Sequence, residues 1–131
     1  MKPAVFLFGE SEKGEFGNPL ICHSLMHLCD KFGFPPKESQ GIPYAIQTLL
    51  YNRQLLFCRV QEEGFSVEDY MKGFTLLKKE KCPPQLQAIF IPGVGNNTII
   101  ETATEVCSLY NSSLVITEKD LYDYLTMPTI I

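Results

Sequence analysis

Four short stretches of the chain are apolar at nearly every position, and longer amphipathic segments separate them. The first, AVFLF over residues 4–8, ends at Gly9, and the others cover residues 54–60, 86–91 and 114–116. Continuous apolar runs of this length, bounded by polar turns, are typical of strands that are buried on both faces. We therefore predict four strands of one covered sheet.

Between these runs, apolar residues recur at the three- and four-residue spacing of a helix that buries one face. Pro19 suits the first turn of a helix that would run to Phe32 and stop at Gly33. Further helices are expected over residues 43–53, 66–81, 97–110 and 117–125. Thr117, with an acidic residue three positions later, has the pattern of a capping box for the last of them.

Apolar strands that alternate with amphipathic helices indicate a parallel sheet with helices on both faces. The 131 residues fit a single α/β domain, and neither a linker nor an internal repeat divides them. The prediction is a small three-layer, Rossmann-like domain over residues 1–131, with a mostly parallel four-stranded sheet.

Charge and cysteine content narrow the functional classes. The formal net charge of −4 argues against general nucleic-acid binding, which needs Lys and Arg to replace counterions. The five cysteines are odd in number and form no C-x-x-C pair, which favours a reducing compartment over a secreted disulfide framework. No stretch approaches the roughly 20 apolar residues of a membrane span, so we expect a cytoplasmic protein with no membrane partner.

If the strands are parallel, their carboxyl ends share one edge of the sheet, which is where open α/β sheets bind ligands. Four polar loops would leave that edge, at residues 9–18, 61–65, 92–97 and 117–120. A shared site at this edge is therefore the central functional expectation.

The third loop carries the clearest binding pattern. Gly93, Gly95, Asn96, Asn97 and Thr98 follow a strand and open a helix, where free N–H groups and the helix dipole favour an anion. The run resembles the dinucleotide fingerprint G-x-G-x-x-G, with Thr98 in place of the third glycine. That resemblance implies an acidic side chain that hydrogen-bonds the ribose of the dinucleotide, and Glu118 would supply it. Lys119 could face the anion. The alternative is a glycine turn followed by an asparagine N-cap.

The first loop contains three glutamates, of which Glu10 stands nearest the strand end. Glu10 could act as a general base or hold a hydrated Mg²⁺, and the alternative is an ordinary solvated acidic loop. His23, His27 and Asp30 would share one face of the first helix, a spacing that can hold a metal, although we assign no metal site.

Two functions stay open at this point. The first is a module that binds a small anionic ligand, such as a nucleotide or phosphate compound, with Glu10 as the acid or base if it is an enzyme. The second is a non-catalytic adaptor or regulatory protein that uses the fold for protein contacts. The aromatic residues Tyr122 and Tyr124 and the apolar tail 127–131 could then cover a sheet edge or a second subunit.

Overall fold

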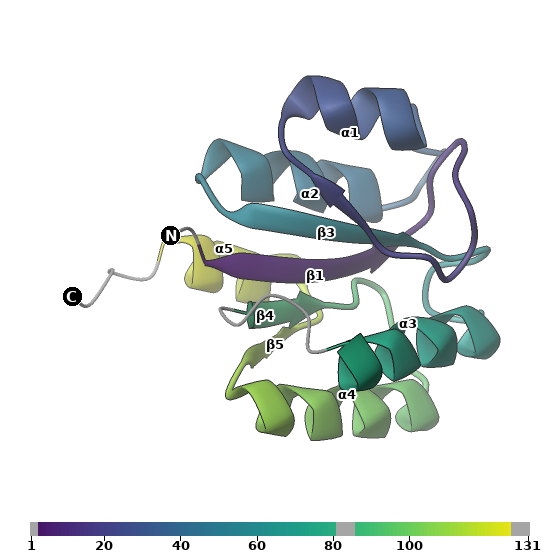
Figure 1. The fold of residues 1–131 in the computed structure, drawn as a ribbon, viewed down its shortest axis with the longest axis vertical. Helices are drawn as coiled ribbons and strands as arrows, with labels where there is room; N and C mark the ends of the chain where they lie inside the picture. The colour runs from purple at the N-terminus through teal and green to yellow at the C-terminus, as the bar shows by residue number, and fades with distance from the viewer. Residues whose placement is uncertain (1–2, 81–85, 127–131) are drawn as a thin grey trace.

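The computed structural model describes residues 3–80 and 86–126, and within them the chain forms an α/β fold of five strands and five helices (Figure 1). The strands are β1 (Ala4–Gly9), β2 (Leu20–Cys22), β3 (Gln54–Arg59), β4 (Leu86–Phe90) and β5 (Ser113–Val115). The helices are α1 (Leu25–Phe32), α2 (Gly41–Leu50), α3 (Val67–Glu80), α4 (Asn97–Tyr110) and α5 (Glu118–Leu125).

The strands form one sheet in the order β2-β3-β1-β4-β5. β1 pairs in parallel with β3 on one side and with β4 on the other, and β5 continues the parallel set beside β4. The arrows of β1, β3 and β4 accordingly point the same way in Figure 1. The expected common direction of the four apolar segments is confirmed, so their carboxyl ends lie along one edge.

The strand β2 corrects the predicted four-stranded sheet and the predicted helix start at Pro19. Residues 20–22 pair antiparallel with β3, which makes the sheet mixed. Helix α1 begins only at Leu25, because the Ser24 side chain accepts a hydrogen bond from the His27 N–H and caps it. His23 therefore precedes the helix, so the two histidines do not share a helical face, although their rings stack with the centroids 5.4 Å apart.

Helices cover both faces of the sheet and bury a separate apolar cluster on each. Alternate strand residues such as Phe6, Phe8 and Ile89 pack with α3 and α4. Their neighbours, among them Leu7 and Phe90, pack with α1, α2 and α5. Figure 1 shows α1 and α2 above the sheet and α3 and α4 below it. This two-sided burial explains why β1, β3 and β4 are apolar along most of their length.

The described helices include none that is long and apolar enough to cross a membrane.

Cys22, Cys58 and Cys107 are buried, and burial raises the pKa of the Cys22 and Cys107 thiols to about 11 and that of Cys58 to about 12. The tail 127–131, expected to cover an edge or a subunit, lies outside the described residues.

Candidate functional site

The strand order creates a topological switch point at the carboxyl edge. The chain leaves β1 toward β3 on one side, whereas it leaves the adjacent β4 toward β5 on the other side. In open α/β sheets, the diverging connections at such a point leave a crevice that ligands use. The loops after β1 and β4, which contain Glu10 and the Gly93–Thr98 turn, flank this point.

Glu63, in the loop after β3, holds the amino-terminal end of α2. Its Oε2 accepts hydrogen bonds from the Glu10 N–H at 2.8 Å and the Gly41 N–H at 2.9 Å, and its Oε1 accepts one from the Gln40 N–H at 2.9 Å. The helix start therefore binds an anion, as its unpaired N–H groups and dipole favour, but the anion is this chain's own carboxylate.

Glu10, the predicted acid or base, takes part in the same arrangement. Its Oε2 accepts a hydrogen bond of 2.9 Å from the Glu63 N–H. Each of the two glutamates therefore binds the backbone N–H of the other with its carboxylate. The close approach of Gly9 and Gly41 makes this possible, because a Cβ on Gly9 would lie 2.5 Å from the Gly41 Cα. One oxygen of Glu10 stays without a partner among the described residues.

The loop after β3 also reaches the loop after β4. A Cβ on Gly64 would lie 2.6 Å from the Gly93 carbonyl oxygen, so the two backbones are in direct contact. The Gly64 N–H donates a 2.9 Å hydrogen bond to the buried hydroxyl of Tyr70, which ties this loop to α3. The loops after β1, β3 and β4 are thus joined at one rim.

The Gly93–Thr98 turn is the open part of this rim. Asn96 caps α4, because its Oδ1 accepts from the Ile99 N–H at 3.1 Å, as the N-cap alternative expected. A Cβ on Gly93 or Gly95 would meet no atom within 4 Å. Within the described ranges, the N–H groups of Gly95, Asn97 and Thr98 have no hydrogen-bond acceptor.

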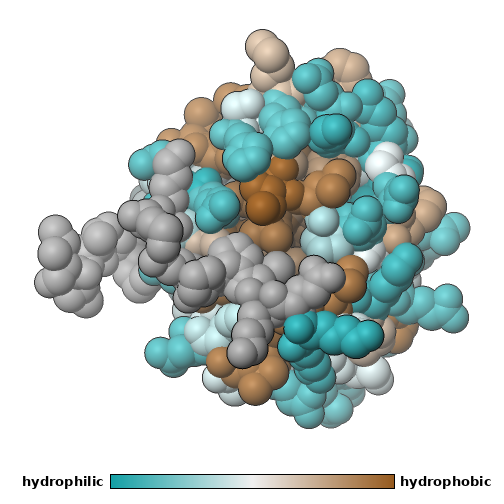
Figure 2. Space-filling model, in the orientation of Figure 1, coloured by the Kyte–Doolittle hydropathy of each residue, from teal (hydrophilic) through white to brown (hydrophobic). Residues whose placement is uncertain are grey.

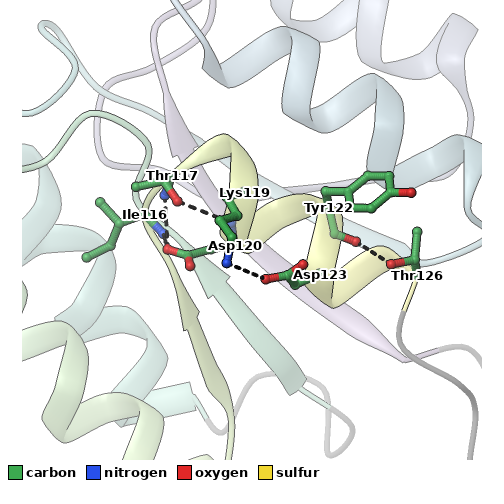
Figure 3. A network of polar contacts seen from close by, with 7 residues as sticks. All are labelled: Ile116, Thr117, Lys119, Asp120, Tyr122, Asp123 and Thr126. Carbon is green, nitrogen blue, oxygen red and sulfur yellow. Dashed lines mark hydrogen bonds and ion pairs between the residues drawn. The ribbon is translucent and has the colours of Figure 1, made fainter.

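The other two predicted ligand residues, Glu118 and Lys119, lie on α5, which covers the opposite face of the sheet from α4. Lys119 forms an ion pair of 3.6 Å with Asp123 one turn further along the helix (Figure 3). The predicted capping box is confirmed: Thr117 accepts from the Asp120 N–H, and Asp120 accepts from the Thr117 N–H. The hydrogen bond from the Thr117 N–H to the Asp120 carboxylate lowers the pKa of that carboxyl. Glu118 has no partner among the described residues.

The rest of the first loop is fixed by Arg59 rather than left free for chemistry. The Arg59 guanidinium donates to the carbonyl oxygens of Ser11, Gly14 and Glu12 at 3.1, 2.6 and 3.4 Å, and it stacks over the Phe16 ring. Among residues 3–80 and 86–126, no three His, Cys, Asp or Glu side chains come together as a metal site.

Comparison with protein families, with curated proteins and with solved structures gives no match to this chain. Glu63 is the rim residue that the sequence did not single out. Its one local signal is its place in the polar loop that follows the buried strand β3.

Proposed function

We propose that the chain is a Rossmann-like module that binds a small anionic ligand, such as a phosphate compound or a nucleotide, at the carboxyl edge of its sheet. The anion would lie against the Gly93–Thr98 turn. The observation that carries this proposal is the set of unpaired N–H groups of Gly95, Asn97 and Thr98 at the start of the 14-residue helix α4. The open space beside both glycines lets a ligand reach that backbone.

The strand order supports the same position. Counted among the parallel strands alone, the order is second, first, third, fourth, which is a common order of doubly wound sheets. The turn adjoins the switch point of that order. Glu10 lies across the rim with one free carboxylate oxygen, where it would act as the acid or base if the bound ligand reacts.

Thermal unfolding with inorganic phosphate and with adenosine monophosphate tests the proposal, with sodium chloride at equal ionic strength as the reference. A ligand present at 100 times its Kd stabilises the folded state by about 2.7 kcal/mol, which raises Tm by roughly 10 °C in a domain of this size. The variant Gly95→Trp should fold and lose this rise, while Thr104→Trp, on the exposed side of α4, should keep it. Equal Tm values in phosphate and chloride would refute the proposal.

A second function, protein contact through the β2 edge, has an observation of its own. β2 lies at the end of the sheet, and its outer side pairs with no described strand. Figure 2 shows an apolar area in the middle of the face where β2 crosses in Figure 1. Ile21 in β2 and Leu25 just after it are exposed, and Leu25 lines a hollow of about 350 Å³ with Leu50. An unpaired apolar edge of this kind favours pairing with a second strand.

The occupant we propose for this edge is β2 of a second copy, in a twofold dimer. Sedimentation velocity should show a dimer for the native chain and a monomer for Ile21→Lys, which places a charge at the centre of the edge. A monomer at every protein concentration for the native chain would exclude this function.

A further inference from the structure

A hollow of about 370 Å³ lies between α2 and α5, on the face of the sheet opposite α4. Its volume falls within the range of small-ligand sites, roughly 300–1,000 Å³. Three tyrosines line it: Tyr44 lies in α2, Tyr51 caps the carboxyl end of α2, and Tyr122 lies in α5. The other lining residues include Pro43, Leu125 and Glu118. The Tyr122 ring extends away from the Lys119–Asp123 pair in Figure 3. The hollow is therefore aromatic, with a carboxylate in its wall.

Tyr44 is the unusual residue of this hollow. Its side chain is 5% exposed, and its ring packs edge-on against Phe90 with the ring centroids 6.5 Å apart. Its hydroxyl is buried and has no hydrogen-bond partner among the described residues. A buried polar group without a partner is costly, so such a group calls for an explanation. Tyr44 lines the hollow, and a small shift of its ring would bring the hydroxyl to a ligand bound there, which would supply the missing partner.

The electrostatics of the hollow favour a positive ligand. Burial raises the pKa of the Tyr44 phenol, and the nearby carboxylates of Glu118, Asp120 and Glu63 raise it further. Asp120 and Glu63 already accept backbone N–H groups, whereas Glu118 has no partner in the described structure. One uncommitted negative charge therefore remains in the wall. The faces of tyrosine rings also attract cations.

We propose that this hollow binds a small organic amine in its ammonium form. The ammonium group would donate one hydrogen bond to the Glu118 carboxylate and another to the Tyr44 oxygen, and the carbon body would lie against the tyrosine rings. An ammonium group has donors only, so it satisfies both oxygens at once. An anion would meet the Glu118 carboxylate in the wall, and a hydrocarbon would leave the Tyr44 hydroxyl unpaired. This site is separate from the anion site proposed at Gly93–Thr98.

Calorimetric titration with three probes of similar shape tests this proposal. Benzylamine is the cation, benzyl alcohol the neutral analogue and benzoate the anion. Benzylamine should bind at least tenfold more tightly than benzyl alcohol, because hydrogen bonds to charged groups are stronger than neutral ones. Benzoate should not bind. Equal affinities for the three probes, or no binding of benzylamine, would overturn the proposal.

Two variants locate the site and check each other. Glu118→Gln and Tyr44→Phe should each weaken benzylamine binding by about tenfold. Glu101→Gln changes an exposed carboxylate on α4, on the other face, and should leave the affinity unchanged. Near-ultraviolet circular dichroism checks that Tyr44→Phe is folded, and Glu118→Gln changes only an exposed side chain. Loss of binding that is equal in Glu101→Gln and Glu118→Gln would refute the location, whatever phosphate does at the Gly93 turn.

Discussion

Replacement of Glu63 by glutamine should destabilise the fold far more than the same replacement at an exposed glutamate. The carboxylate accepts three backbone N–H groups, from Glu10, Gln40 and Gly41. The amide oxygen of glutamine can keep at most the two that share Oε2, and its NH₂ group would then face the third donor. A lost hydrogen bond to a charged group costs about 1.5–3 kcal/mol. The two remaining bonds lose their charge assistance, and the helix loses an anion worth roughly 0.3–1 kcal/mol. We expect a loss of about 3 kcal/mol.

Equilibrium urea unfolding followed by circular dichroism measures this loss, with the m-value checked for two-state behaviour. Glu62→Gln is the matched control, because the Glu62 side chain is exposed and has no hydrogen bond within the described residues. The control should change the free energy of unfolding by less than about 0.5 kcal/mol. If Glu63→Gln also stays within about 0.5 kcal/mol of the native chain, Glu63 does not anchor the start of α2.

Three further perturbations separate features of the fold. Tyr70→Phe removes the oxygen that accepts the buried Gly64 N–H and should cost about 1–3 kcal/mol in urea unfolding, and an unchanged stability would show that this bond is dispensable. Gly9→Ala places a Cβ against the backbone of α2 and should lower Tm sharply, whereas Gly95→Ala enters open space and should leave Tm nearly unchanged; similar Tm values for the two would contradict the packing at the rim. Asp120→Asn should be less stable than the native chain at neutral pH, because the folded-state pKa of this carboxyl is lowered, and the stability it contributes is present above its unfolded pKa. The difference should shrink as the pH falls below 3.8 and through the lowered pKa of the folded state, and a difference that is constant across this range would exclude the capping role.

The strands β1, β3, β4 and β5 could be predicted because their signal is local. A run such as AVFLF is apolar on both faces, and only a strand covered on both sides buries all of it. The direction of the strands also followed, since helices between apolar strands imply parallel crossovers. The order of the strands could not be predicted, because it depends on where each connecting segment returns to the sheet. The connection from β3 to β4, for example, crosses over β1, and the sequence of no single segment determines this.

The edge strand and the Glu63 contacts could not be predicted for a related reason. β2 is three residues long, and it is a strand only because β3, more than thirty residues later, pairs with it. Pro19 is a common first residue of a helix, yet the Ser24 cap starts α1 later. Glu63 gains its role from backbone groups 22 to 53 residues away. In each case the partner is distant in sequence.

The candidate ligand residues also divide into those that local sequence could place and those that it could not. The Gly93–Thr98 turn could be placed from the sequence, because a strand end, two glycines and a helix start are adjacent. Glu118 and Lys119 were associated with that turn by sequence spacing alone. In the structure they belong to a helix on the other face, where Glu118 lines the hollow beside Tyr44.

The most direct test of the anion site is a titration of the isotope-labelled chain with inorganic phosphate, followed by amide chemical shifts in nuclear magnetic resonance spectra. We expect saturable shifts of the Gly95, Asn97 and Thr98 amides, with chloride at equal ionic strength producing none. The amides of Gln40 and Gly41 should not respond, because Glu63 already occupies that helix start. Shifts confined to other parts of the chain, or none at the Gly95–Thr98 amides, would contradict the anion site.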